Sequence, residues 1–215
     1  MTHSCVNCLP CANLRPPPIP VTVREISPEI ASWWDANVQP EINKDLSRAD
    51  TGWFWQYITS FNEHSVPLVQ RPMGLAICLQ IPDTTATLPY GRPIGLVQLL
   101  RKYAYVADTA FHCIHVQFLS TIPRQLLPAP YEARLTGQAL VDIAIVQSLL
   151  HNYQGRVSST VVKDLRRLTH WHTSSCGMHF CQEVSTPGTH WFAHDLGTAR
   201  RAYDKLKSFR SECIK

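Results

Sequence analysis

Residues 134–139 (RLTGQA) have the composition of a turn that could bind a phosphate group. Upstream, the apolar residues 111–119 (FHCIHVQFL) predict a buried strand, because the stretch is too short for an independent helix. Downstream, apolar side chains recur at helical spacing over residues 135–153, and Gly155 supplies a stop. The first N–H groups of a helix lack partners within the helix and lie at the positive end of its dipole. The turn therefore predicts a phosphate or pyrophosphate site, where Gly137 would let the ligand approach the backbone closely.

Composition and charge limit the class of protein. With 215 residues, 45% hydrophobic and 17% charged, the chain can bury one sizeable core and does not resemble a disordered protein. A formal charge of +4 suits an anionic ligand or an RNA partner, but it is far from the dense basic surface of a dedicated nucleic-acid binder. No run of 18 apolar residues predicts a transmembrane helix, and the N-terminus has no secretory signal. A cytoplasmic location with eight reduced cysteines is therefore expected.

Strands and helices alternate along the chain. The expected strands lie at residues 21–26, 74–81, 94–105, 111–119 and 156–162, from residue 177, and at 190–193. The expected helices lie at residues 27–34, from about 50 to 61, at 135–153, in a segment ending at 176, and at 197–209. Because the early strands are hairpin-like, we expect a single α/β domain with a mixed, mostly antiparallel central sheet flanked by helices. Residues 1–20 are expected to form a flexible Cys/Pro-rich tail and residues 21–215 the domain.

At residues 134–139 the chain resembles the GNAT superfamily, the acyl-CoA-dependent N-acyltransferases, whose signature is Gln/Arg-x-x-Gly-x-Gly/Ala. The order of elements is also similar to that family's succession from its third strand to its sixth, with Gly177-Met178 in place of the usual Gly-Phe. The resemblance spans roughly residues 21–209. It implies a GNAT-like fold with a sheet splayed at the cofactor site, and acetyl-CoA as cofactor. It also implies transfer of an acetyl or other acyl group to a primary amine, by direct attack in a ternary complex.

The resemblance also implies which residues would hold coenzyme A. The turn would cradle the pyrophosphate, and the pantetheine arm would bond the backbone of the strand that feeds the turn. The cofactor-binding residues expected on this basis are Val116, Phe118, Leu119, Arg134, Leu135, Thr136, Gly137, Gln138 and Ala139. Strict alternation along the strand places Cys113, His115, Gln117 and Leu119 on one face, and His112, Ile114, Val116 and Phe118 on the other.

Two departures from the family pattern concern proton transfer. Family members often carry a glutamate base near this strand, and this strand has none; His115 is the first candidate base and His112 the second. The alternative for either is a neutral histidine satisfied by a buried hydrogen bond. Many members place a tyrosine acid four residues before Gly-Phe, a position that Thr173 occupies here. Ser174, His172 or water could then serve as acid, or the thiolate could leave unaided.

Two further features leave alternatives open. The aromatic residues between 53 and 61 either pack in the core or form one wall of an acceptor pocket. Cys5, Cys8 and Cys11 have the spacing of zinc or iron–sulfur ligands, but the alternative of a disordered leader is favoured, and no metal is assigned.

Three functional hypotheses remain. The first is the N-acyltransferase, with an amine acceptor carried by a small molecule, a protein or an aminoacyl-tRNA. The second is a non-catalytic acyl-CoA sensor or interaction module on the same fold. The third is a zinc-stabilised nucleic-acid binder built around the three N-terminal cysteines. No membrane partner is expected, and homodimer formation is left open.

Overall fold

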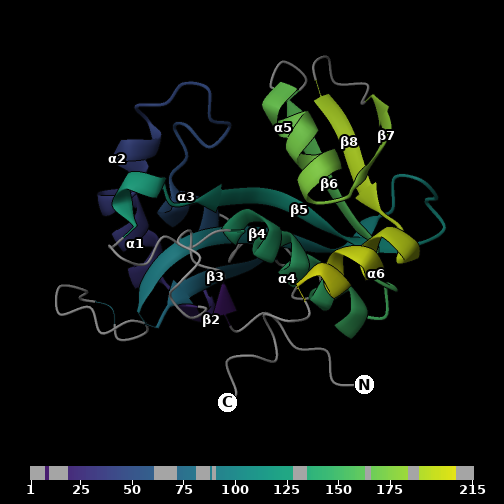
Figure 1. Ribbon diagram of the computed structural model, residues 1–215, viewed down its shortest axis with the longest axis horizontal. Helices are drawn as coiled ribbons and strands as arrows, with labels where there is room; N and C mark the ends of the chain where they lie inside the picture. The colour runs from purple at the N-terminus through teal and green to yellow at the C-terminus, as the bar shows by residue number, and fades with distance from the viewer. Residues whose placement is uncertain are drawn as a thin grey trace.

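The computed structural model describes residues 8–9, 19–60, 72–80, 88, 91–127, 135–162, 166–183 and 189–206. Their strands form one sheet in the order β1-β2-β3-β4-β5-β6-β8-β7 (Figure 1). The strands are β1 Cys8–Leu9, β2 Ile19–Glu25, β3 Met73–Leu79, β4 Arg92–Ala104, β5 His112–Thr121, β6 Val157–Val162, β7 His179–Glu183 and β8 Thr189–His194. Among these described strands only β5 and β6 pair in parallel, so the expected α/β class with a mixed, mostly antiparallel sheet is confirmed.

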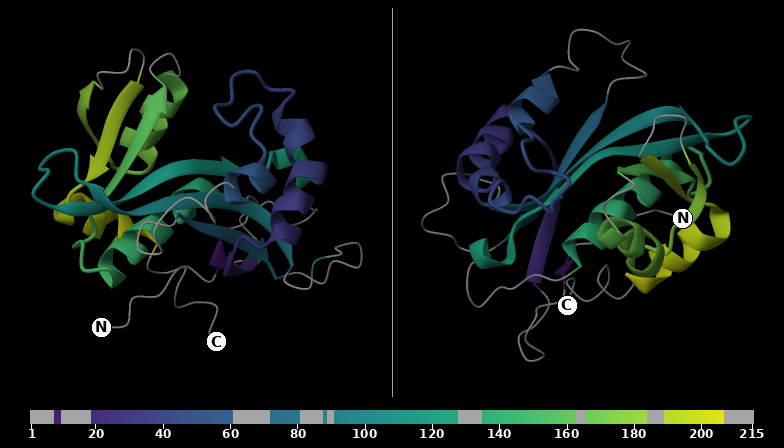
Figure 2. Two further views of the ribbon diagram at one scale, coloured as in Figure 1. Left: turned by 180° about the vertical axis from the view of Figure 1, so that it is seen from behind. Right: turned by 90° about the horizontal axis from the view of Figure 1, so that it is seen from above.

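Helices cover both faces of this sheet, with α1 to α3 on one side and α4 and α6 on the other (Figure 2). The described helices are α1 Pro28–Asn37, α2 Gln39–Ile42, α3 Trp55–Ser60, a 3₁₀ turn Arg124–Leu126, α4 Thr136–Leu150, α5 Arg166–His170, a π-helical turn Trp171–Ser175 and α6 Leu196–Lys205. The predicted start of α1 is confirmed, because Ser27 accepts a hydrogen bond from the Ile30 N–H and Pro28 opens the first turn. The predicted helix from about residue 50 begins only at Trp55.

Gly95 on β4 brings the first turn of α4 close to the sheet. A Cβ at this position would lie 2.8 Å from Thr136 Cγ2 and 3.0 Å from Leu140 Cδ1. Gln98, three residues further along β4, faces the opposite side and donates a hydrogen bond to the carbonyl of Ile58 in α3. The absence of a side chain at Gly95 therefore sets how closely the N-terminus of α4 approaches the strands.

The sheet splits between β5 and β6. Their parallel pairing covers three residue pairs only and ends at Val116↔Ser159. β5 continues along β4 to Thr121, whereas β6 continues along β8 to Val162. Figure 1 shows the two strands diverging from this point, with β6, β8 and β7 leaving the plane of the other strands. The predicted splay is confirmed.

A β-bulge at Gln117 alters which side chains share a face of β5. Val116 pairs with Leu99 and Phe118 with Gln98, so Gln117 has no partner residue on β4. Since alternation restarts after the bulge, Val116 and Leu119 share one face. The prediction from strict alternation is therefore wrong beyond Val116.

Part of the expected N-terminal tail belongs to the sheet. Leu9 is fully buried, and β1 pairs with the beginning of β2, which starts at Ile19 rather than at residue 21. The structure therefore places these residues in the sheet, and the division into a tail and a domain at residue 21 stays a prediction. Residues 1–7 and 10–18, including Cys5 and Cys11, lie outside the described residues, as do residues 207–215.

None of the described helices has the length and apolar character needed to cross a membrane.

Candidate cofactor-binding and active site

A cavity of about 300 Å³ opens where β5 and β6 diverge, and we call it the splay cavity. Its described lining residues are Ala49, Trp53, Val116, Gln117, Leu119, Val141, Ser159, Thr160, Val161, Leu168, Trp171, His172 and Met178. Apolar side chains form most of this wall, and the lining comes from both diverging strands. The cavity therefore lies along the edge of β5 that β6 leaves unpaired.

A second cavity of about 300 Å³, the turn cavity, adjoins the first at the start of α4. Its described lining residues are Asp45, Ser47, Arg48, Ala49, Asp50, Leu119, Thr121, Gly137, Arg167, Leu168 and Trp171. The two cavities share Ala49, Leu119, Leu168 and Trp171. Together they lead from the helix N-terminus to the split in the sheet.

The N-terminus of α4 presents backbone donors that no bond within the helix uses. Leu135 has a left-handed conformation (φ 62°) as the N-cap and provides no side-chain capping bond. The Ala139 N–H bonds the Leu135 carbonyl at 2.8 Å, which makes it the first intrahelical bond of α4. The N–H groups of Thr136, Gly137 and Gln138 therefore have no partner within the helix. Such donors, together with the helix dipole, suit a phosphate group.

Gly137 has a close neighbour that the sequence does not predict. A Cβ there would lie 2.8 Å from Cζ2 of Trp171, so the indole occupies space next to this glycine. Gly137 is thus required for the packing of Trp171 as well as for an open helix start. Trp171 in turn forms part of the wall of both cavities.

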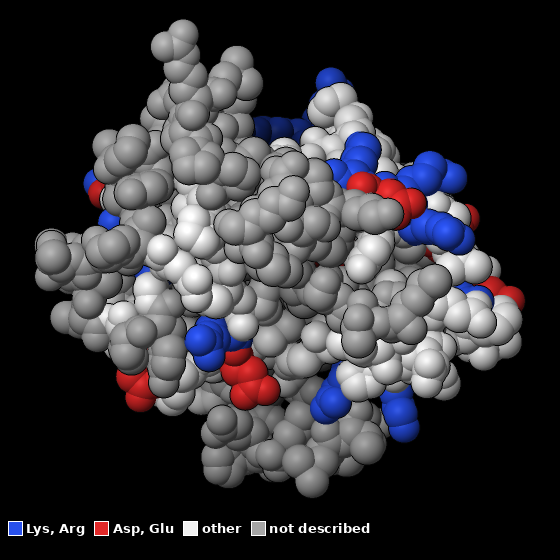
Figure 3. Space-filling model, turned by 60° about the horizontal axis from the view of Figure 1, so that its bottom comes forward, with Lys and Arg blue, Asp and Glu red and all other residues white. Residues whose placement is uncertain are grey.

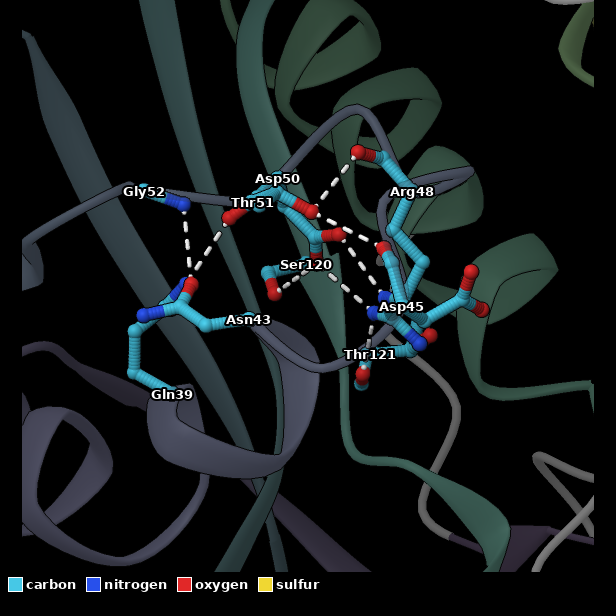
Figure 4. Close-up of polar contacts among 9 residues, drawn as sticks. All are labelled: Gln39, Asn43, Asp45, Arg48, Asp50, Thr51, Gly52, Ser120 and Thr121. Atoms are coloured by element: carbon cyan, nitrogen blue, oxygen red, sulfur yellow. Dashed lines mark hydrogen bonds and ion pairs between the residues drawn. The ribbon is translucent and has the colours of Figure 1, made fainter.

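A partly buried ion pair anchors the loop that forms one wall of the turn cavity (Figure 4). Arg48 donates to both carboxylate oxygens of Asp50, from Nε at 2.8 Å and from Nη2 at 2.7 Å. Arg48 Nη2 also donates to the Thr121 carbonyl at 2.7 Å, and Ser120 Oγ donates to Asp50. On its other side Asp50 accepts, through its carbonyl, a bond from Gln39 Nε2 at 2.8 Å. This network ties the loop to the end of β5. The later start of α3 coincides with bonds from the Trp55 and Gln56 N–H groups to the Asp35 carboxylate, at 2.8 and 2.9 Å.

His115, the first candidate base, lies in the core rather than in the described lining of either cavity. Its ring stacks on Tyr103 at 4.4 Å between centroids and lies 5.2 Å from Trp191. Nδ1 lies 3.0 Å from Ser158 Oγ, so the ring has a buried hydrogen-bond partner. Burial lowers the pKa of His115 from 6.5 to about 4. These contacts match the alternative of a neutral, satisfied histidine, and a catalytic role for His115 stays a prediction.

The two other predicted catalytic residues are exposed. His112 begins β5 and lies 6.2 Å from the Tyr153 ring, and Ser174 bonds His170 Nδ1 at 3.2 Å. Neither is among the described lining residues of the two cavities. Thr173, in the place of the family's tyrosine, is also exposed and bonds the Thr169 carbonyl. Their proposed roles remain predictions.

His172, one of the alternatives for the acid, does line the splay cavity. It is buried, and Nδ1 lies 2.8 Å from the carbonyl oxygen of Leu168. Burial lowers the pKa of His172, and the hydrogen bond to Leu168 opposes part of this effect. The π-helical turn that carries His172 had no recognisable signal in the sequence.

The expected cofactor-binding residues fall into three groups. Val116 and Leu119 line the splay cavity, whereas Phe118 faces the other side and contacts Trp53 at 4.8 Å between ring centroids. Leu135, Thr136, Gly137, Gln138 and Ala139 form the helix start, and Arg134 lies outside the described residues. Contact of these residues with a cofactor stays a prediction.

The aromatic residues before and within α3 were expected either to pack in the core or to form one wall of an acceptor pocket, and the structure shows examples of both positions. Trp55 is fully buried, as expected of a core residue. Trp53 lines the splay cavity, as expected of a cavity wall, and packs edge-to-face on Phe118. Phe54 and Tyr57 are exposed.

The face of the molecule shown in Figure 3 is mixed in charge. On this face, described basic and acidic side chains are interspersed without a broad area of one sign. Within the described residues no group of three or more His, Cys, Asp or Glu side chains could hold a metal ion.

The arrangement defines an α/β protein with a split mixed sheet and a helix N-terminus that opens onto the split. No family model matches the sequence, and no curated protein matches it. A domain from Methanocaldococcus jannaschii has the same fold, with a TM-score of 0.53 and 12% identity over 82% of this chain and 98% of that one. Apo FdhC, a nucleotide-linked sugar GNAT, has a TM-score of 0.53 and 11% identity over 98% of this chain and 99% of its own. An uncharacterized protein from Bacillus halodurans has a TM-score of 0.51 and 10% identity over 88% and 91% of the two chains.

The chain therefore has the GNAT fold, as residues 134–139 and the order of elements predicted.

The hydrogen-bond network of Asp50 predicts that replacing this carboxylate by an uncharged amide destabilises the fold. Asp50→Asn leaves the partly buried Arg48 guanidinium without its carboxylate, and should lower the free energy of unfolding by about 2 kcal/mol. Glu41→Gln breaks the exposed pair with Lys44 and should cost less than about 0.5 kcal/mol. Urea unfolding of both variants measures the difference, and equal losses would contradict the assigned role of Asp50.

The lowered pKa of the buried His115 predicts that the stability of the fold depends on pH. Its folded pKa is about 4 and its ordinary pKa 6.5, so between these values the unfolded chain binds a proton that the folded chain does not. The free energy of unfolding should therefore fall as pH drops from 6.5 towards 4, with His115 contributing up to roughly 3 kcal/mol. His194, whose pKa burial also lowers to about 4, contributes in the same window.

The check is denaturant unfolding at neutral and acidic pH, with His115→Gln as the comparison. The variant should lose less stability than the wild type on acidification. An NMR titration that finds the His115 ring protonating near its ordinary pKa would contradict this prediction.

Proposed function

We propose that the chain is an acyl-CoA-dependent N-acyltransferase, which moves an acetyl or other acyl group from coenzyme A to a primary amine by direct attack in a ternary complex. One observation carries the proposal: N–H groups without an intrahelical partner at the start of α4 border the turn cavity, which adjoins the cavity where β5 leaves β6. A ligand with an anionic end and an extended arm fits both features. The fold similarity is consistent with this but supports no reaction by itself.

The helix start fits the pyrophosphate end of coenzyme A. The donors are the N–H groups of Thr136, Gly137 and Gln138, at the positive end of a 15-residue helix. Arg167 lines the same cavity and supplies positive charge. Asp45 also lines it, so the arginine and the backbone donors together must outweigh one exposed carboxylate there.

The splay cavity fits the pantetheine arm and the thioester. The bulge leaves Gln117 without a partner residue on β4, and among the described residues β5 beyond Val116 has no partner residue on β6. The arm can therefore extend the sheet by bonding the backbone of β5 there. When bound, acyl-CoA supplies a reactive thioester; the chain's own residues hold it beside the amine and exclude water. The mostly apolar wall, with Trp53, Leu119 and Met178, would exclude water.

The acceptor in this proposal is an amine carried by a small molecule, a protein or an aminoacyl-tRNA. Trp53 lines the cavity, and the exposed Phe54 and Tyr57 follow it in the sequence. These aromatic side chains would form the acceptor side of the site.

A second candidate function is a non-catalytic acyl-CoA sensor. The described lining of the splay cavity contains no Asp, Glu or Tyr, the residue types that commonly move protons in such sites. Saturable binding of acetyl-CoA, with no acyl transfer to any amine in a panel, would favour the sensor over the enzyme.

The helix start predicts the effect of a charge at residue 137. Gly137→Glu places a carboxylate among the N–H groups of the first turn and should weaken acetyl-CoA binding at least about 100-fold, by repulsion and by filling the site. Calorimetry with acetyl-CoA measures the change. Micromolar binding is expected for the wild type.

Gly137→Ala is the control, because its Cβ displaces Trp171 without adding charge. It should weaken binding much less than Gly137→Glu does. Absence of binding in the wild type, or equal binding by the wild type and Gly137→Glu, would contradict the proposed cofactor site.

A further inference from the structure

We propose that His172 carries the transferred proton, accepting it on Nε2 from the attacking amine and delivering it to the sulfur of the leaving coenzyme A. This inference rests on the proposed function and names the residue that would move the proton at the same site.

His172 is positioned by an unusual piece of helix. α5 continues after His170 into a π-helical turn, in which the Cys176 N–H bonds the Trp171 carbonyl at 3.1 Å. The Met178 N–H then bonds the His172 carbonyl at 3.0 Å and fixes the end of the turn. Single π-helical turns are often found at functional sites, because they re-aim one side chain within an otherwise regular helix. Here the turn places Trp171 and His172 side by side in the cavity wall.

The hydrogen bond of His172 assigns its tautomer. Nδ1 lies 2.8 Å from the Leu168 carbonyl oxygen, which can only accept a hydrogen bond. Nδ1 must therefore carry the proton, and in the neutral ring Nε2 keeps its lone pair. Because burial lowers the pKa of His172, the neutral ring predominates at pH 7 and can act as a base.

The neighbouring rings hold the imidazole in one orientation. Trp171 packs edge-on at 4.8 Å and Phe192 lies 5.2 Å away, between ring centroids. Phe192 is fully buried in β8, so one side of the imidazole rests on the core. A fixed ring loses little freedom when a reacting group arrives.

No other described residue of the splay-cavity wall can exchange a proton near neutral pH. Besides His172, its side chains belong to Ala, Trp, Val, Gln, Leu, Ser, Thr and Met. The catalytic residues predicted from the sequence are not among the described residues of this wall. The His115 ring stacks on Tyr103, and His112 and Ser174 are exposed. Aminolysis of a thioester requires both removal of an amine proton and protonation of the sulfur.

The proposed step balances. The neutral amine nitrogen attacks the thioester carbon, and an N–H proton moves to Nε2 of His172 as the C–N bond forms. The C–S bond then breaks, with its electron pair passing to sulfur, and the proton on Nε2 moves to that sulfur. The products are an amide and the coenzyme A thiol, His172 returns to its neutral form, and nothing is oxidised or reduced.

The test is His172→Asn, which keeps an amide donor for the Leu168 carbonyl but removes Nε2. Acetyl-CoA is the acyl donor, and the acceptor is whichever member of a panel gives wild-type turnover: spermidine, an aminoglycoside, a peptide with a free N-terminus or an aminoacyl-tRNA. The expected result is a fall in kcat of about 10²- to 10⁴-fold, with the Kd for acetyl-CoA and the KM of the amine changed by less than about threefold.

His170→Asn is the matched control, since it changes an exposed histidine on the same helix and should leave kcat unchanged. Wild-type kcat in His172→Asn would overturn the inference. If that variant does not fold, ¹⁵N NMR of the wild-type histidines decides: a proton on Nδ1 and a lone pair on Nε2 support the inference, and the opposite tautomer overturns it. Failure of the wild type to bind acetyl-CoA would instead overturn the proposed function, so the two failures are distinguishable.

Discussion

The structure depends on a parallel pairing that stops early. β5 and β6 share three residue pairs, and after Val116↔Ser159 each strand follows a different neighbour. Among the described residues, backbone groups along this open edge of β5 then have no ladder partner on β6, although such groups are almost always paired when buried. A sheet can tolerate such an edge where a ligand or solvent takes the place of the missing strand. The cavity at this edge is therefore a direct consequence of the early end of the β5–β6 pairing.

The other parts of the site are arranged around this split. Gly95 allows the first turn of α4 to approach β4, which brings N–H groups without an intrahelical partner to the mouth of the split. The Arg48–Asp50 pair fastens the opposite wall to the end of β5. From the side of β6, the π-helical turn contributes Trp171 and His172. Three separate segments thus converge because the sheet opens between them.

Much of the fold followed from local patterns. The strand and helix order, the Ser27-Pro28 helix start and the turn before α4 depend on short-range signals, namely periodicity, caps and glycine. The details that control the site depend on long-range contacts. Gln117 reads as an ordinary strand residue, and only its register against β4 reveals the bulge. His172 reads as one of several histidines, and its selection requires both the π-helical turn and the position of the cavity. The prediction for Gly137 was incomplete for the same reason. Its packing against Trp171 could not be predicted, because the two residues are 34 positions apart in sequence.

The most direct test of the account is to map acetyl-CoA on the protein by backbone amide NMR. The account predicts the largest shifts at Gly137 and Gln138 in the first turn of α4, and at Val116, Gln117 and Ser159 around the split. That pattern would place the two ends of the ligand at the helix start and along β5. Shifts confined to the cavity between α4 and α6, around Ile145 and Ala202, or no shifts at all, would contradict the assignment of the split as the cofactor site.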